Sequence, residues 1–285
     1  MCSFVEAPPG RSFVSHSRTK RRADRNFHIR HFERALEDAR TVLYPVVVTI
    51  YLCHEQPELY LHEASVVDAR PGAVVLSRSA FHPGGGGQVS DVGELEWSDG
   101  RAHVTGIEVD GDRWWHLLDV DATPTGDVQL RIDAEHRRRV ASLHTTSHVL
   151  NAFVFAEFAG ALVTGAQING DGTGRMDFDL PEVDNDRVRA LAAPVNDVIA
   201  RGIDVRAVYV DASDAAVTEG LVRSMSVAPP PTADGKLRII DIDGVDRQAC
   251  GGTHLANTGQ SRPVVITKVE NKGRHNRRVR FALAS

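Results

Sequence analysis

Residues 134–159 read AEHRRRVASLHTTSHVLNAFVFAEFA, a stretch without glycine or proline. The absence of both helix breakers predicts one long helix across this stretch. His144 and His148 stand four residues apart in it, so on a helix they lie one turn above each other on the same face. The helix can therefore offer two imidazole nitrogens to a single ion.

A second pair repeats the four-residue spacing about a hundred residues later, in Cys250-Gly251-Gly252-Thr253-His254. This segment joins a thiolate to a third imidazole on a glycine-rich turn that can bend around a metal. Imidazole and thiolate together are the ligand set that zinc prefers. We expect one Zn²⁺ per chain. The same four residues are the expected metal ligands and the expected catalytic residues: His144, His148, Cys250 and His254.

The ligand set alone leaves the role of the metal open. Four protein ligands normally close a structural zinc site, whereas a catalytic zinc keeps one position for water or substrate. A metalloprotease is disfavoured, because its His-Glu-x-x-His motif needs a carboxylate where this chain has Thr145. A thiol hydrolase in which His254 activates Cys250 is an alternative, but metal ligation of both residues would quench that chemistry.

Composition indicates a soluble globular protein with one large domain or two ordinary ones. The chain has 285 residues, of which 42% are apolar and 25% are charged, enough to bury a sizeable core. No apolar run is long enough to cross a bilayer and no signal-peptide pattern opens the chain, so we expect a cytoplasmic protein with no membrane partner. Three scattered cysteines do not suit a disulfide framework. Nothing in the sequence demands an oligomer, and we expect a monomer.

The formal net charge of −5 argues against a nucleic-acid partner when it is taken alone. The cations, however, are clustered in two places. Arg137, Arg138 and Arg139 precede the first histidine, and residues 262–280 hold seven Lys and Arg against the single acid Glu270. Clusters of this kind can bind a phosphate backbone. The alternative is that they are solvated faces that keep the protein soluble.

Three regions follow one another along the chain. Residues 1–44 have no core-forming pattern and form an N-terminal extension that is disordered or holds a short helix around His31 to Arg40. It is either a basic arm that touches RNA or a dispensable tail. Residues 45–130 alternate short β-type runs with turn signals, which predicts a small antiparallel barrel or sandwich. The strands expected there are Val46–Leu52, Ala73–Leu76, His103–Val109, Arg113–Leu118 and Val128–Ile132.

Residues 131–285 mix helices and strands, so the predicted fold class is α+β. The long helix is followed by strands near 162–168 and 174–180, and then by an amphipathic helix from Asp186 to Arg201 in which Pro194 predicts a kink. A strand from Ile203 to Val210 and a short helix starting near Asp211 come next. Further strands are expected at Lys236–Ile242, Pro263–Glu270 and Arg278–Leu283.

Phe81–Gln88 contains four consecutive glycines, Gly84 to Gly87. The segment lacks the Lys-Ser/Thr ending of a phosphate loop and the following helix of a dinucleotide site, so nucleotide binding is disfavoured. A run of glycines frees the backbone of side chains and permits close approach by another surface. A flexible loop between barrel strands is the alternative.

Five segments in order resemble the AlaX family of free-standing alanyl-tRNA editing proteins, which are related to the editing domain of alanyl-tRNA synthetase. The resemblance covers about Val46 to Ala284 and implies a medium-length member, with an N-terminal β-barrel that carries the glycine motif and an α+β editing domain. Two departures are the N-terminal 44 residues, which have no counterpart, and His82, which stands where Tyr is more usual. The five segments are Phe81–Gly93, His144–His148, Arg175–Asp179, Gln248–His254 and Lys272–Arg280.

The resemblance implies an aminoacyl-tRNA deacylase that hydrolyses tRNA(Ala) mischarged with serine, or in some members with glycine. The four zinc positions carry over to the two spaced pairs above. A pocket that pairs with the serine hydroxyl would reject alanine, because its polar groups would be left unsatisfied. A zinc-stabilised RNA-binding protein without catalysis, in which the barrel does the binding, is the alternative. The expected substrate contacts are Thr145, Thr164, Gln167, Gly85, Gly86, Gly87, Arg277 and Arg278.

Overall fold

The computed structural model of the protein describes residues 49–181, 184–217, 220–221, 223, 229, 232 and 234–285. Predictions for the extension at 1–44 and for residues 45–48 lie outside these ranges. Residues 47–285 form one compact unit by their contacts. The domain division expected at residue 130 therefore stays a prediction, although a strand ends at Ile132 and a helix begins at Ala134, close to that point.

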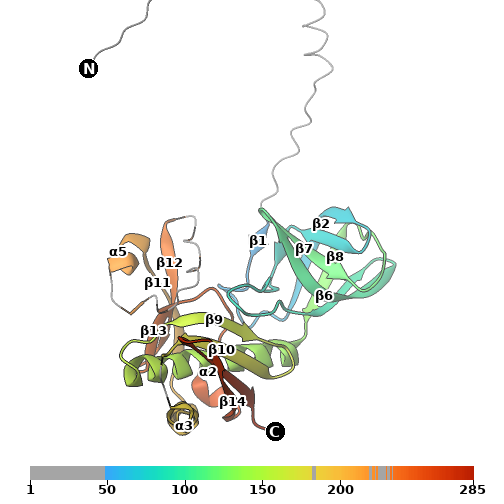
Figure 1. Cartoon of the computed structure of the whole chain (residues 1–285). Helices are drawn as coiled ribbons and strands as arrows, with labels where there is room; N and C mark the ends of the chain where they lie inside the picture. Colours follow the sequence, from blue (N-terminus) through green and yellow to red (C-terminus); the bar gives the residue numbers. More distant parts are fainter. Residues whose placement is uncertain are drawn as a thin grey trace, which may run out of the picture. The chain divides into compact units, whose positions relative to one another are not determined.

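Six antiparallel strands close the N-terminal barrel in the order β2-β3-β7-β6-β5-β8 (Figure 1). Alternate residues point inward, as in β8, where Val128, Leu130 and Ile132 are buried between exposed neighbours. The parallel pair β1 (Ile50–Tyr51) and β4 (Arg78–Ser79) adds a short ladder. The barrel strands are β2 (Leu61–Arg70), β3 (Ala73–Leu76), β5 (Gly93–Trp97), β6 (Gly100–Asp110), β7 (Arg113–Leu118) and β8 (Asp127–Ile132).

Two barrel strands, β2 and β5, are not among those that the sequence predicts. In β2 the inward positions near its start are His62 and Ala64 rather than large apolar residues, which hides the alternation. In β5 only Leu95 of five residues is fully buried. The barrel itself and the α+β class are confirmed.

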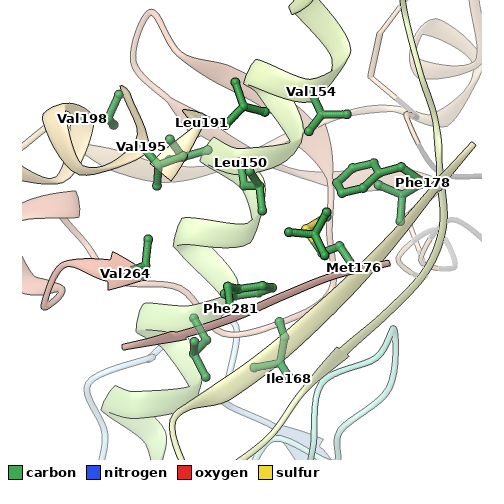
Figure 2. Close-up of a cluster of buried hydrophobic side chains, with 14 of the residues drawn as sticks. Leu150, Val154, Ile168, Met176, Phe178, Leu191, Val195, Val198, Val264 and Phe281 are labelled. Atoms are coloured by element: carbon green, nitrogen blue, oxygen red, sulfur yellow. The ribbon is translucent and has the colours of Figure 1, made fainter. Parts of the chain in front are cut away.

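The long helix α2 (Ala134–Glu157) begins after Asp133, whose side chain accepts hydrogen bonds from the backbone N–H groups of Glu135 and His136. A four-stranded antiparallel sheet, in the order β14-β15-β10-β9, packs against it. Figure 2 shows Leu150 and Val154 of the helix facing Met176, Phe178 and other apolar side chains. The four strands are β9 (Val163–Ile168), β10 (Thr173–Asp179), β14 (Val264–Lys272) and β15 (Asn276–Leu283).

At the predicted kink the helix is interrupted at one residue, Leu191, between α3 (Asn185–Ala190) and α4 (Ala192–Arg201). Pro194 has no N–H to donate to the carbonyl of Ala190, and its ring crowds that carbonyl. The chain therefore ends one helix and starts another at Leu191. Val195 and Val198 of α4 complete the core beside α2.

A third sheet, in the order β11-β12-β13, leads the chain to the second half of the predicted metal site. It comprises β11 (Val205–Asp211), β12 (Lys236–Ile242) and β13 (Asp246–Ala249). The short helix α5 (Ala212–Val217) follows β11, and a 3-10 turn, Thr258–Gln260, follows β13 in the sequence. β13 ends directly before Cys250. Among the described residues, no helix combines the length and the apolar character that a membrane span requires.

Candidate metal centre

The four side chains that the two spacings single out lie together. The potential ligand atoms of His144, His148, Cys250 and His254 are all within 4.8 Å of one another. Cys250 Sγ is 3.3 Å from Nε2 of both His144 and His254. α2 supplies the first two residues, and the loop after β13 supplies the other two. The cluster can hold one metal ion, because each residue offers one nitrogen or sulfur ligand.

Gln88 of the glycine-rich segment determines which nitrogen His144 presents. Gln88 Oε1 accepts a hydrogen bond from the backbone N–H of Thr253 at 3.0 Å, so this atom is an acceptor. His144 Nδ1 lies 2.6 Å from the same oxygen and must therefore carry the hydrogen. The unprotonated Nε2 is left to face Cys250 and is free to bind a metal.

The other two imidazoles are oriented in the same sense by different partners. His148 Nδ1 lies 3.0 Å from Oδ2 of Asp246, a buried carboxylate that also accepts bonds from Arg223 and Gln248. His254 Nδ1 lies 3.3 Å from the hydroxyl oxygen of Thr145. A partner on Nδ1 leaves Nε2 for the metal, which is the usual arrangement behind a metal-binding histidine.

The electrostatics of the cluster favour a thiolate. Burial alone would raise the pKa of the Cys250 thiol, but His144, His254 and His148 together hold that pKa well below its usual value. Burial would also lower the pKa of His148, yet the neighbouring Cys250 and Asp246 raise it to about 10. A metal ion that binds here competes with a proton for His148, and the lowered pKa of Cys250 favours the thiolate that ligates metals.

Gly252 leaves the space that the cluster needs. A Cβ atom at this position would lie 2.1 Å from Cε1 of His144 and 2.6 Å from Oε1 of Gln88. Neither neighbour can move without losing the bond that orients the imidazole. Any side chain at this position would therefore push His144 out of place.

Comparison with known proteins identifies the family. Residues 237–280 match the family described as the threonyl and alanyl tRNA synthetase second additional domain. The alanyl-tRNA editing protein AlaX-M of Methanosarcina acetivorans is 36% identical over 220 residues, which cover 74% of this chain and 88% of the relative. That of Saccharolobus solfataricus is 32% identical over 238 residues, covering 79% and 98%.

The chain belongs to the AlaX family of alanyl-tRNA editing proteins. The resemblance stated from the five segments is thereby confirmed. The alanine–tRNA ligase of Korarchaeum cryptofilum is also similar, with 32% identity over 238 residues and 82% of this chain. The chain spans only 26% of that much longer enzyme.

The glycine motif of this family member lies against β9. Ile168 N–H donates to the carbonyl of Gly87 at 2.7 Å, and a Cβ at Gly87 would lie 2.5 Å from the carbonyl oxygen of Ala166. Close approach by another surface, expected from the run of glycines, is thus provided by β9. Gly85 and Gly86 are exposed, with no described atom within 4 Å of a Cβ built on either.

Three expected substrate contacts already bond with protein groups. Thr145 is fully buried, and its hydroxyl oxygen faces His254 and accepts the backbone N–H of Leu255 at 3.1 Å. This geometry favours a role in orienting His254 over reading a substrate hydroxyl. Thr164 donates to Asn276 at 3.1 Å, and Gln167 donates to Asn169 at 3.0 Å. Their part in substrate binding stays a prediction.

Three arginines of the expected cationic clusters are buried or paired with acids in the structure, and the part of Arg277 and Arg278 in substrate binding stays a prediction. Arg137 is buried and paired with Asp91, so it is not available to phosphate. Arg277 is also buried, and Arg278 donates two bonds of 2.7 Å to Asp177. A cluster read from the sequence cannot distinguish a paired or buried guanidinium from a free one. Two exposed cations remain near the turn between β14 and β15, where no described acid pairs with them: Lys272 and Arg274.

Two residues that orient the ligands, Gln88 and Asp246, escape sequence reasoning. Gln88 stands out in the sequence only as the end of the glycine motif, and Asp246 lies in a strand that the sequence does not predict. Each lies far along the chain from the histidine that it contacts, by 56 and 98 residues. No local sequence pattern can indicate a contact between residues so far apart in the chain.

Proposed function

We propose that this protein is a trans-editing deacylase that hydrolyses the ester bond of Ser-tRNA(Ala), with Gly-tRNA(Ala) as a second candidate substrate. Membership of the AlaX family supports tRNA editing as the task. The observation that carries the proposal is the convergence of three imidazoles and one thiolate within 4.8 Å. An aminoacyl ester is already activated, so the site needs only electrophilic help, a positioned water and a selective pocket.

We propose Zn²⁺ as the metal. Three nitrogen donors and one thiolate suit zinc, and the orientation of all three imidazoles through Nδ1 supports a metal on Nε2. When bound, zinc supplies Lewis-acid chemistry to a carbonyl or a water. The protein's own groups do the positioning: Gln88 holds His144, Asp246 holds His148 and Thr145 holds His254.

For substrate recognition we propose Thr164 and Gln167 as readers of the amino acid, and Gly85 and Gly86 as a surface that the end of the tRNA can approach closely. Exposure of both glycines supports this role. A polar pocket that pairs with the serine hydroxyl would discriminate against alanine, because its groups would otherwise be unsatisfied.

For the tRNA backbone we propose Lys272 and Arg274 as phosphate contacts. The distribution of charge favours residues 134–285, rather than the barrel region, as the part that binds tRNA. Residues 49–133 hold fifteen Asp and Glu against five Arg and no Lys, whereas residues 134–285 hold eighteen against nineteen Lys and Arg. The barrel region thus has ten more acids than cations, and such a surface repels phosphate. This disfavours the alternative in which the barrel binds RNA.

The test is deacylation of Ser-tRNA(Ala) by the full-length protein, with Ala-tRNA(Ala) as the matched substrate. We expect rapid loss of serine, little loss of alanine, and one zinc per chain by metal analysis. Chelation should abolish the activity. Binding of tRNA with an intact ester would favour the non-catalytic alternative, and activity that survives chelation but not thiol alkylation would favour the thiol hydrolase.

A further inference from the structure

The loop that carries Cys250 is attached to neighbouring side chains through three of its own consecutive carbonyl groups. Arg238 Nη1 donates to the carbonyl of Cys250 at 2.7 Å and to that of Gly252 at 3.0 Å. The carbonyl of Gly251 lies 2.6 Å from Nε2 of His54 and 2.9 Å from Nε2 of His82. Neither histidine is a candidate metal ligand, and both precede the editing part of the chain.

Both histidines must act as donors, because a carbonyl oxygen only accepts. For His82 a second bond agrees with this tautomer, since its Nδ1 accepts the backbone N–H of Gly84 at 3.0 Å. His82 is 3% exposed, and its bonds are therefore shielded from water. Two donors occupy both lone pairs of one carbonyl oxygen.

The double attachment matters because the loop contains two adjacent glycines. Glycine has the greatest backbone freedom of any residue, so an unattached Cys-Gly-Gly segment would sample many conformations. In the structure the backbone N–H of Gly252 points at Cys250 Sγ, 3.4 Å away. Holding the carbonyls keeps that N–H and the thiolate in the orientation that the metal centre requires.

We infer that His54 and His82 are positioning residues that set the Cys250 thiolate in the metal centre, so that the barrel region is part of the editing site. The inference rests on the proposed function for its catalytic consequence, but its effect on the metal centre can be measured separately. Since both histidines bond to one oxygen, their effects should be non-additive: each alone preserves part of the attachment.

The experiment uses full-length protein loaded with Co²⁺ in place of zinc, and compares H54L, H82L and the double variant with wild type. We expect the double variant to lose most of the thiolate-to-cobalt absorption band, to bind zinc at least about 10-fold more weakly, and to lose kcat with little change in KM for the tRNA. In H54Q the amide nitrogen can replace Nε2 of His54, so this variant should keep the part of the band that H54L loses. The matched control is H103Q, at an exposed histidine of β6.

An unchanged cobalt spectrum and zinc affinity in a folded double variant would overturn the inference. If the double variant does not fold, the single variants decide, because each must weaken the band and H54Q must recover it relative to H54L. Failure of the proposed function has a different signature: wild type would show the thiolate band and its dependence on the histidines, but would not deacylate Ser-tRNA(Ala).

Discussion

At the scale of single residues, the candidate metal centre depends on groups that orient the histidine rings. Three imidazoles present Nε2 because an amide, a carboxylate and a hydroxyl lie against their Nδ1 atoms. The three partners differ in charge, and only Asp246 is an acid. Each partner is buried, so its loss cannot be made good by water.

The first prediction concerns Gly252. We expect G252A to abolish tight zinc binding and deacylation, because the new Cβ would lie 2.1 Å from the ring of His144. Isothermal titration with zinc measures the first effect. The control is G251A, whose Cβ would meet only Pro229 at an ordinary 3.5 Å. Equal zinc affinity in the two variants would contradict the steric argument.

The second prediction concerns Asp246. D246N removes the charge behind His148 and leaves Arg223 facing a neutral amide. We expect zinc affinity to fall by roughly 10- to 100-fold, the usual effect of losing a partner behind a metal-binding histidine. Competition with a chromophoric chelator measures it. D243N, at an exposed position in the same region, should leave the affinity unchanged.

At the scale of elements, α2 is unusual in being buried along much of its length. Every residue from Val140 to Asn151 is buried, with the apolar core on one side and the metal cluster on another. Near its start, Arg137 bonds to Asp91 and to the carbonyls of Pro57 and Ala80. These bonds attach the helix to segments of the barrel region that precede β5.

The third prediction follows from that attachment. R137Q leaves Asp91 as a buried carboxylate without its cation, and breaking a buried pair in this way costs about 3–5 kcal/mol. We expect a loss of that order in the free energy of unfolding, measured by urea denaturation. R138Q changes the exposed neighbouring arginine and should change stability by less than about 0.5 kcal/mol. Similar stability of the two variants would contradict the buried role.

At the scale of the whole molecule, charge is unevenly distributed along the chain, with an acidic barrel region and a nearly neutral remainder from residue 134 onward. The barrel also encloses titratable groups. His116 is fully buried and its Nε2 bonds to the hydroxyl of Ser79 at 2.8 Å. Burial lowers the pKa of His116 to about 4, and burial likewise lowers the pKa of His62 to about 4.

The fourth prediction is acid sensitivity. An unfolded histidine has a pKa near about 6.5, so between this pH and about pH 4 the unfolded state binds a proton that the folded state excludes. Stability is therefore complete above about pH 6.5 and falls as the pH drops toward about 4, by roughly 3 kcal/mol for His116 alone. Urea denaturation across this range measures the slope. H116Q should reduce the slope by the share of His116 and leave that of His62, and H103Q should not change it.

The sequence by itself determined the local features of this protein. The stretch 134–159, free of glycine and proline, predicted α2, the two four-residue spacings predicted the cluster of three histidines and one cysteine, and Pro194 predicted a kink near the point where the helix is interrupted. Alternating short runs predicted most of the barrel. These features could be read because each depends on residues only a few positions apart, where backbone geometry alone sets which side chains share a face.

Only the tertiary structure decided what those residues contact. It placed Gln88 and Asp246 behind the metal-site histidines, turned Thr145 toward His254, and brought His54 and His82 to one carbonyl. It also buried Arg137 and Arg277, which the sequence alone could not separate from free cations. Such pairings join segments far apart in the chain, and they arise from packing, which no local pattern of residues records.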